Sequence, residues 1–381
     1  MQRISLFYPK KIVFGNDSLN NFWEDFISSG LSRLFIVTTE PVMPLILEGI
    51  YALEKNNVEI KVDGSIASEP SVNTVKKILH SAREHKAEGI LGIGGGSVLD
   101  VAKIIAALLN NNQNINDTFG IGRLSGRSTY LACIPTTSGT GSEMSPNAIL
   151  LDPSDNQKKG VISPFLIADA VYVDPKLTLT LPPFITATTG MDALIHCLEA
   201  YTNKFAHPIV DLYALKGIEL IASNLKRACD NGSDIEARNA LALGSMYGGM
   251  CLGPVNTAAV HAISYPLGGE YHIAHGLSTS LILPYVMEFN TPASVSRYAE
   301  VAFALGCDGK KTDEETAYAG IEKIKRISES CGLPQKLSEV GIPYEALSHI
   351  AGMAMGVTRL LKNNVREVTY NDVMNIYEKA Y

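Results

Sequence analysis

Short apolar runs alternate with amphipathic segments in the first half of the chain. The runs at 34–39 and 89–96 predict buried strands, and the segments at 74–85 and 97–109 have the spacing of helices. Strands that alternate with helices form parallel sheets through βαβ connections. We therefore expect an α/β domain built from parallel βαβ units.

The N-terminal segment ISLFYPKKIVFGNDSL alternates apolar and polar residues around a Pro-Lys-Lys centre. A period of two residues is typical of strands whose two faces differ in exposure. The segment therefore predicts a hairpin or a ribbon at the edge of the sheet.

The second half of the chain has mostly helical periodicity, as in DALIHCLEAY, DLYALKGIELIASNL and EARNALALGSMYGGMCLG. The paired prolines Pro182 and Pro183 indicate a break, followed by a helix that starts at or after Thr186. We therefore predict an α/β domain over residues 1–182 and an all-helical domain over residues 183–381.

Composition and charge favour a globular protein that acts on small molecules. The 381 residues are 46% hydrophobic and 19% charged, and the 32 basic and 39 acidic residues give a net charge of −7. This balance excludes intrinsic disorder and disfavours nucleic acid or an anionic membrane surface as a partner. Without a long apolar run, a signal-peptide pattern or a CxxC pair, we expect a cytoplasmic protein with buried or neutral thiols.

Three consecutive glycines join the predicted strand at 89–96 to the helix that follows. Glycine lets a backbone approach a ligand closely, and the N–H groups at a helix start suit a pyrophosphate. The candidate phosphate cradle is Gly94, Gly95, Gly96 and Ser97. The same residues suit a tight turn without a ligand, and the usual dinucleotide motif lies in the first βα turn instead. Asp100, in the first helical turn, suits an interaction with the helix dipole at least as well as contact with a ligand.

A second polar cluster, IPTTSGTGSEMSPNAIL, spans 134–150. Its hydroxyl side chains and glycines suit a ribose or a diphosphate, and also an ordinary exposed loop. Because ligands gather at the carboxyl ends of parallel strands, the two loops together favour a dinucleotide.

One carboxylate and several histidines mark the helical half. Asp192 and His196 are one helical turn apart, a spacing suited to chelation and also to an ion pair. His261, His272 and His275 lie in apolar or glycine-bearing segments, where a buried imidazole is either a core residue or a ligand. Together these residues could hold Fe(II), Zn(II) or a similar divalent ion. The remaining histidines have polar neighbours and are expected at the surface: His80, His85, His207 and His349.

The segments GGGSVLDVAK, PTTSGTGSE, GMDALIHCLEAY, AVHAISYPLGG and AHGLSTSLILPYVMEFN together resemble the iron-containing (group III) alcohol dehydrogenases. The resemblance runs in order from FYPKKIVFG to at least Asn290. It implies that residues 1–182 bind a dinucleotide and that the helical residues 183–381 carry a catalytic metal.

The resemblance also implies roles for individual residues. It assigns four metal ligands, namely Asp192, His196, His261 and His275. Near the cofactor it places Gly95, Gly96, Ser97, Thr136, Thr137 and Thr140. Lys158 has about the spacing of a family lysine near the cofactor, although the neighbouring Lys159 is an alternative.

Two positions depart from the family pattern. Tyr265 stands where many members carry a second histidine beside the nicotinamide. Thr39, followed by Glu40, stands where members that prefer NAD often carry an aspartate for the ribose hydroxyls. Losing that carboxylate removes repulsion against a 2′-phosphate, so the cofactor is predicted as NAD or NADP.

The predicted activity is hydride transfer between NAD(P) and a small primary or secondary alcohol, with an aldehyde or ketone as the product. His272 is a candidate for proton relay, or for a hydrogen bond to the cofactor ribose or a loop carbonyl. The alternatives are a metal-independent enzyme of the maleylacetate reductase type, a three-ligand zinc enzyme such as glycerol dehydrogenase or dehydroquinate synthase, and a non-catalytic metal- or nucleotide-binding paralogue. A homodimer is expected, because dimers are the commonest oligomers of soluble enzymes, and the N-terminal ribbon could pair across a twofold axis.

Overall fold

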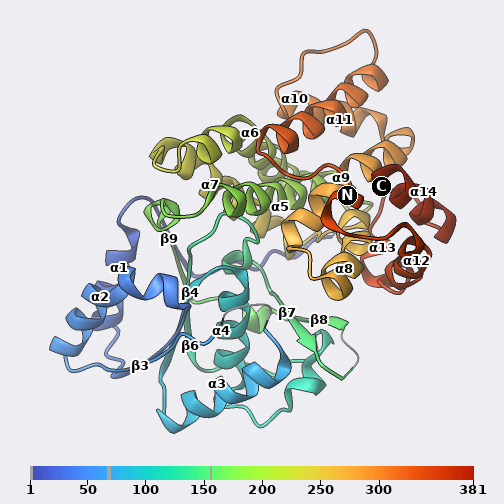
Figure 1. Ribbon diagram of the computed structural model, residues 1–381. Coiled ribbons are helices and arrows are strands. Elements are labelled where there is room, and N and C mark those ends of the chain that lie inside the picture. The colour runs from blue at the N-terminus through green and yellow to red at the C-terminus, as the bar shows by residue number, and fades with distance from the viewer. Residues whose placement is uncertain (1–2, 67–69, 155–156) are drawn as a thin grey trace. The chain divides into compact units, whose positions relative to one another are not determined.

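A computed structural model describes residues 3–66, 70–154 and 157–381 (Figure 1). Internal contacts divide the chain into two units. The α/β unit comprises Leu6–Thr137 and Gly141–Leu179. The helical unit comprises Thr180–Tyr381, the short segment Ser138–Thr140 and the described residues before Leu6.

The α/β unit is built on a six-stranded sheet whose strands pair in parallel throughout. The strand order is β1-β9-β6-β4-β2-β3. The strands are β1 (Lys11–Phe14), β2 (Arg33–Val37), β3 (Glu59–Asp63), β4 (Gly89–Gly94), β6 (Tyr130–Pro135) and β9 (Ala170–Val173). Strands β2 and β4 are the two apolar runs predicted from the sequence.

Helices cover both faces of this sheet, which is why its central strands read as continuous apolar runs. The helices of this unit are α1 (Ser18–Ser28), α2 (Met43–Lys55), α3 (Val72–Glu84) and α4 (Gly96–Leu108). On one face, Phe22 and Phe26 of α1 and Ile46 of α2 pack in a single core with alternate residues of β2, β4 and β6. On the other face α4 lies very close to β4, because a Cβ on Gly92 would be 2.6 Å from that of Ala102.

A smaller three-stranded sheet completes the α/β unit. It contains β5 (Gly120–Ile121), β7 (Asn147–Asp152) and β8 (Gln157–Ile162) in the order β5-β8-β7. Strands β7 and β8 pair antiparallel, and β5 pairs in parallel with β8.

The N-terminal segment forms an edge strand, as predicted, but the predicted hairpin is wrong. Strand β1 pairs in parallel with the distant strand β9, from Lys11 opposite Ala170 to Phe14 opposite Val173. Pro9 has no N–H group to donate to a neighbouring strand, and the backbone turns after β1 at Gly15, where φ is +140°. The segment therefore adds one strand to the sheet rather than folding back on itself.

The helical unit consists of α5 (Pro183–Tyr201), α6 (Pro208–Asp230), α7 (Ile235–Leu252), α8 (Ala259–Tyr271), α9 (His275–Asn290), α10 (Val295–Ala304), α11 (Asp313–Ser330), α12 (Leu347–Met355), α13 (Thr358–Leu361) and α14 (Tyr370–Ala380). Helix α5 is almost entirely buried and packs against α6, α7 and α9. Small residues allow this packing, since a Cβ on Gly190 would lie 2.4 Å from Leu225 of α6.

Two details of the helical unit correct the sequence analysis. Helix α5 begins at Pro183 and not at or after Thr186, because proline is well suited to the first helical position, where its missing N–H is not needed. His207 is only 5% exposed rather than at the surface. Its Nδ1 accepts a hydrogen bond from the backbone N–H of Ile209 at 3.3 Å and thereby caps α6.

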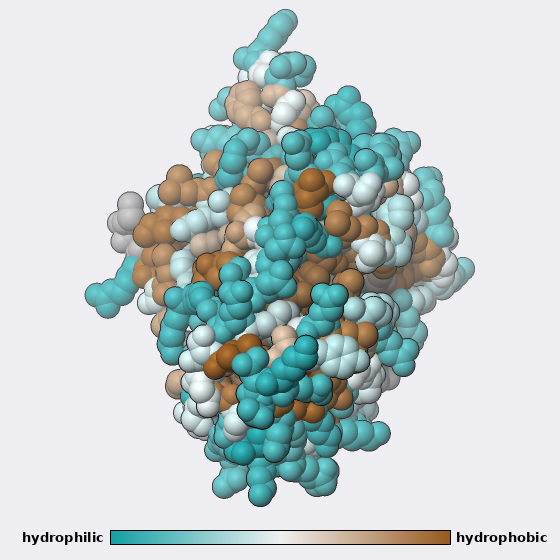
Figure 2. Space-filling model, turned by 90° about the vertical axis from the view of Figure 1, so that its left-hand side faces the viewer, coloured by the Kyte–Doolittle hydropathy of each residue, from teal (hydrophilic) through white to brown (hydrophobic). Residues whose placement is uncertain are grey.

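The burial of the cysteine thiols and the polarity of the surface are those of a globular protein. The thiols of Cys133, Cys197, Cys229 and Cys251 are buried, and burial raises the pKa of Cys133 and Cys197 to about 12. The face shown in Figure 2 has hydrophilic side chains interspersed with apolar ones. No helix in the described part of the chain is long and apolar enough to cross a membrane.

Candidate metal and cofactor sites

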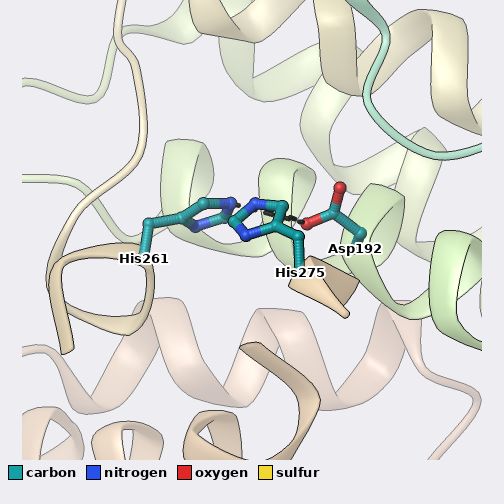
Figure 3. Close-up of side chains that lie close together, drawn as sticks. All are labelled: Asp192, His261 and His275. Atoms are coloured by element: carbon teal, nitrogen blue, oxygen red, sulfur yellow. Dashed lines mark ion pairs between the residues drawn. The ribbon is translucent and has the colours of Figure 1, made fainter. Parts of the chain in front are cut away.

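Three helices of the helical unit bring a carboxylate and two imidazoles together (Figure 3). Asp192 lies in the middle of α5, His261 in the first turn of α8, and His275 is the first residue of α9. Each offers one ligand atom, and the three atoms lie within 4.8 Å of one another. The Nε2 atoms of His261 and His275 are each 3.5 Å from Oδ1 of Asp192.

A glycine sets the distance between two of these helices. A Cβ on Gly276 would lie 2.1 Å from the carbonyl oxygen of Thr188, so only glycine allows α9 to start this close to α5. Thr188 is one helical turn before Asp192, and Gly276 directly follows His275. The close approach therefore places the His275 ring beside the Asp192 carboxylate.

His196 lies beside this group. Its Nε2 is 3.8 Å from Oδ1 of Asp192, and its ring stacks on that of His261 with centroids 4.9 Å apart and planes 18° apart. Four nitrogen and oxygen donors at 2.0–2.2 Å around a tetrahedral ion are about 3.4 Å from one another. Oδ1 of Asp192 is 3.5 to 3.8 Å from Nε2 of each of the three histidines, close to that spacing, so the carboxylate and the imidazoles suit a divalent ion.

Two buried polar atoms at the centre of the group have no hydrogen bond. Within the described ranges, Oδ1 of Asp192 and Nε2 of His261 make none, although Asp192 is 3% and His261 is 2% exposed. A buried polar atom without a partner costs about 1–3 kcal/mol, and a cation between these atoms would remove that cost. The orphaned atoms therefore point to an ion at this position.

Electrostatic coupling within the group is strong. Burial alone would raise the pKa of Asp192, but the imidazoles of His196, His275 and His261 outweigh it and hold the pKa below its ordinary value. Burial lowers the pKa of His196. Burial would also lower that of His261, but the carboxylates of Glu199 and Asp192 raise it to about 9. The carboxylates of Asp192 and Glu199 thus favour positive charge at the position where a cation would bind.

Glu199, which the sequence analysis missed, orients His261. Its Oε2 lies 2.6 Å from Nδ1 of His261, and its Oε1 accepts a hydrogen bond from the N–H of Val260 at 2.6 Å. A carboxylate on Nδ1 leaves Nε2 directed at Asp192, the arrangement that supports metal-ligating histidines. The spacing of Asp192, His196 and Glu199 on one face of α5 could have indicated this residue.

The candidate cofactor residues of the α/β unit meet at one edge of its sheet. Thr39 follows β2, Gly94 ends β4 and Thr136 follows β6, and these three parallel strands are neighbours. The chain runs from β2 outward to β3 and then returns to β4 on the other side of β2, so the strand order reverses there. Ligands of α/β sheets bind at such switch points.

The geometry of the glycine-rich loop suits both a tight turn and a phosphate ligand. A Cβ on Gly94 would lie 2.7 Å from Val98, so the turn requires glycine whether or not a ligand binds. Gly95 caps α4 with an extended backbone, and the free N–H groups at the start of α4 follow at Gly96 and Ser97. A Cβ on Gly95 would lie 3.5 Å from Thr137, so the two polar loops are neighbours.

Asp100 ties these two loops together. Its carboxylate accepts hydrogen bonds from the hydroxyl of Ser142 at 2.5 Å and from the N–H of Ile149 at 2.8 Å. The fully buried ammonium of Lys103 donates to the carbonyl oxygens of Ser142 and Asn147. Asp100 thus has a role that neither interpretation of the sequence included.

The other candidate residues lie in separate places. Thr140 belongs to the segment Ser138–Thr140 of the helical unit, where a Cβ on Gly139 would be 2.8 Å from that of Thr189 in α5. Lys158 lies in β8 opposite Leu151, and Lys159 binds Asp152 at 2.7 Å. His272 is exposed and ends α8 with a φ of +55°.

Comparisons with known proteins define the family. The family model for iron-containing alcohol dehydrogenase matches residues 9–175. The family model for the C-terminal part of the Fe-containing alcohol dehydrogenase family matches residues 186–381. Long-chain-alcohol dehydrogenase 1 of Geobacillus thermodenitrificans is 36% identical, over 92% of this chain and 90% of its own. Sulfoacetaldehyde reductase of Bilophila wadsworthia is 33% identical, over 98% and 97% of the two chains.

Comparison with solved structures points to the same family. The fold matches a crystal structure of 1,3-propanediol oxidoreductase with a TM-score of 0.96 and 27% identity, and an alcohol dehydrogenase from Oenococcus oeni with a TM-score of 0.95 and 29% identity. Both matches cover all of both chains. The chain belongs to the iron-containing alcohol dehydrogenase family. It is an oxidoreductase that transfers a hydride between a nicotinamide cofactor and an alcohol or aldehyde.

Proposed function

We propose that Asp192, His196, His261 and His275 hold one divalent ion, Fe(II) or alternatively Zn(II), and that the enzyme interconverts small alcohols and their aldehydes or ketones. The observation that carries this proposal is the meeting of three ligand atoms from three helices within 4.8 Å. Two of those atoms are buried without a hydrogen bond in the described part of the chain. Family membership adds the reaction type.

The residues of the site have separate tasks. When bound, a divalent ion supplies Lewis acidity that polarises the oxygen of an alcohol or a carbonyl group. The carboxylate of Asp192 balances positive charge inside the buried pocket, and Glu199 keeps Nε2 of His261 directed toward the same point. His272, exposed and three residues before His275, is the proposed route by which a proton reaches solvent.

The cofactor is proposed to bind along the carboxyl edge of the parallel sheet. The backbone of Gly94, Gly95, Gly96 and Ser97 would take the pyrophosphate, with Thr136, Thr137, Thr140 and Lys158 as further contacts. Thr39 would face the ribose and select between NAD and NADP.

The same proposal assigns cofactor binding to residues 1–182 and metal chemistry to residues 183–381. We also infer a cytoplasmic enzyme that works as a homodimer. The relatives are named for a long-chain alcohol, sulfoacetaldehyde and 1,3-propanediol, so their names do not narrow the substrate beyond an alcohol or aldehyde.

Elemental analysis of protein purified without oxygen tests this proposal, followed by NADH and NADPH oxidation with short aldehydes on the same sample. We expect about one iron or zinc ion per chain, with turnover that is lost on chelation and restored by the metal. Turnover without any metal would instead favour an enzyme of the maleylacetate reductase type. Bound metal without turnover would favour a non-catalytic paralogue.

A further inference from the structure

Of the four candidate metal ligands, only His275 is substantially exposed to solvent. The side chains of Asp192, His196 and His261 are 4%, 6% and 3% exposed. The side chain of His275 is 31% exposed. The exposed side of His275 is therefore the opening through which we expect a molecule to reach the ligand group.

Tyr265 stands at this opening. It follows His261 by one turn of α8, so both side chains project from the same face of that helix. Its ring centroid is 6.1 Å from that of His275, while the rings of His275 and His261 are 5.2 Å apart. The ring of His275 thus neighbours both the buried ring of His261 and the ring of Tyr265, which is itself half-buried.

We propose that Tyr265 is a specificity-determining residue that forms a wall beside His275 and limits the length of the alcohol or aldehyde chain. This inference rests on the proposed function, because it requires the substrate oxygen to bind at the ligand group. A substrate held there by its oxygen must extend its carbon chain toward the open side, where the phenol ring stands. A rigid aromatic side chain has only two side-chain torsions and yields little space, so it favours short, unbranched substrates.

Removing the Tyr265 ring should change the selectivity for substrate chain length more than it changes the metal-ligand group. A missing or extra methylene group in an apolar pocket changes discrimination between substrates about 10-fold or more. Tyr265→Ala should therefore raise the ratio of kcat/KM for hexanol over ethanol by about tenfold or more. Tyr265→Phe keeps the ring and should leave that ratio within about twofold of the wild-type value.

A binding measurement tests the same wall without turnover. Protein loaded with Co(II) is titrated with N-alkylimidazoles from N-methylimidazole to N-hexylimidazole, and the visible absorption of cobalt reports binding. In the wild type and in Tyr265→Phe we expect the affinity to fall as the alkyl chain lengthens. In Tyr265→Ala we expect it to rise, and Tyr265→Leu, which keeps more apolar volume, should lie between.

Cobalt content and melting temperature are measured for every variant. Tyr344→Ala, which removes an exposed tyrosine packed on Tyr381, is the matched control and should behave as the wild type. An unchanged alkyl series in Tyr265→Ala and Tyr265→Leu, with native cobalt content and melting temperature, would overturn the inference and leave the proposed function intact. A wild-type protein that takes up no cobalt and turns over no alcohol would overturn both.

Discussion

Glu199 and Asp192 contact opposite nitrogens of the same imidazole. Glu199 lies 2.6 Å from Nδ1 of His261, and Asp192 lies 3.5 Å from its Nε2. The first distance is that of a strong hydrogen bond, whereas the second is too long for one and suits two donors that share an ion. Helix α5 therefore supplies both a ligand and the residue that orients another ligand.

Replacing Glu199 by Gln should weaken metal binding about 10–100-fold while the fold persists. The amide keeps a hydrogen-bonding oxygen but loses the charge that fixes the His261 ring and raises its basicity. Affinity is measured by titration in a metal buffer. Glu270→Gln is the control, since Glu270 binds the exposed His349 at 2.9 Å. Equal affinities in the two variants would contradict an orienting role for Glu199.

Gly276→Ala should disturb the site through the backbone. The new methyl group would lie 2.1 Å from the Thr188 carbonyl oxygen, so α9 must move away from α5 and carry His275 with it. We expect a loss of about 1–3 kcal/mol in stability and reduced metal content. At Gly269 of α8 a Cβ meets nothing within 4 Å, so Gly269→Ala should be neutral or stabilising. Melting temperature and metal analysis compare the two, and equal behaviour would contradict this packing argument.

Stability should fall with rising pH because of Glu143. Burial raises the pKa of this carboxyl to about 7, from 4.5, although nearby Lys103 lowers it somewhat. Between these two values the native state keeps a proton that the unfolded chain has released, so stability is lost as pH rises through that window. A difference of this size corresponds to about 3 kcal/mol.

Glu143→Gln removes the titration and should stabilise the protein more at pH 8 than at pH 5. Melting temperatures at the two pH values measure the effect. Glu54→Gln, at an exposed position of α2, should show the same small change at both. A Glu143→Gln effect that does not depend on pH would show that the carboxyl is not neutral in the native state.

Thr39→Asp should shift cofactor preference toward NAD. Thr39 is half-buried and lies two residues after the end of β2, where a carboxylate would repel a 2′-phosphate and accept hydrogen bonds from the ribose hydroxyls. We expect the ratio of kcat/KM for NADH over NADPH to rise about tenfold or more. Glu40→Gln, which removes the neighbouring exposed carboxylate, should lower the ratio for NADH over NADPH or leave it unchanged. No shift in Thr39→Asp would place specificity elsewhere.

Local pattern predicted the α/β half well because its strands are buried on both faces and its helices are amphipathic. The predicted strands and helices around Gly94 are present as β2, α3, β4 and α4. The partner with which a strand pairs cannot be read from its local pattern. Nothing within the segment around Lys11 states that its partner is β9, some 160 residues later. The local pattern therefore left a hairpin and an edge ribbon as alternatives, and only the edge position was confirmed.

The residues of the site were likewise predicted only in part. The family resemblance could assign Asp192 and three histidines as ligands, and the structure brings Asp192, His261 and His275 together. Glu199 was missed because its partner His261 lies 62 residues away on another helix. His207 was expected at the surface because its polar neighbours give no sign that its ring would cap a helix in a buried position.

The central claim is that the ligand group around Asp192 binds the ion on which the enzyme depends. Its most direct test is the metal content per chain of His261→Ala, compared with His349→Ala, which removes an exposed histidine outside the group. Both variants are purified without oxygen and checked for native circular dichroism. We predict about one ion per chain in His349→Ala and almost none in His261→Ala. The same metal content in both folded variants would contradict the account.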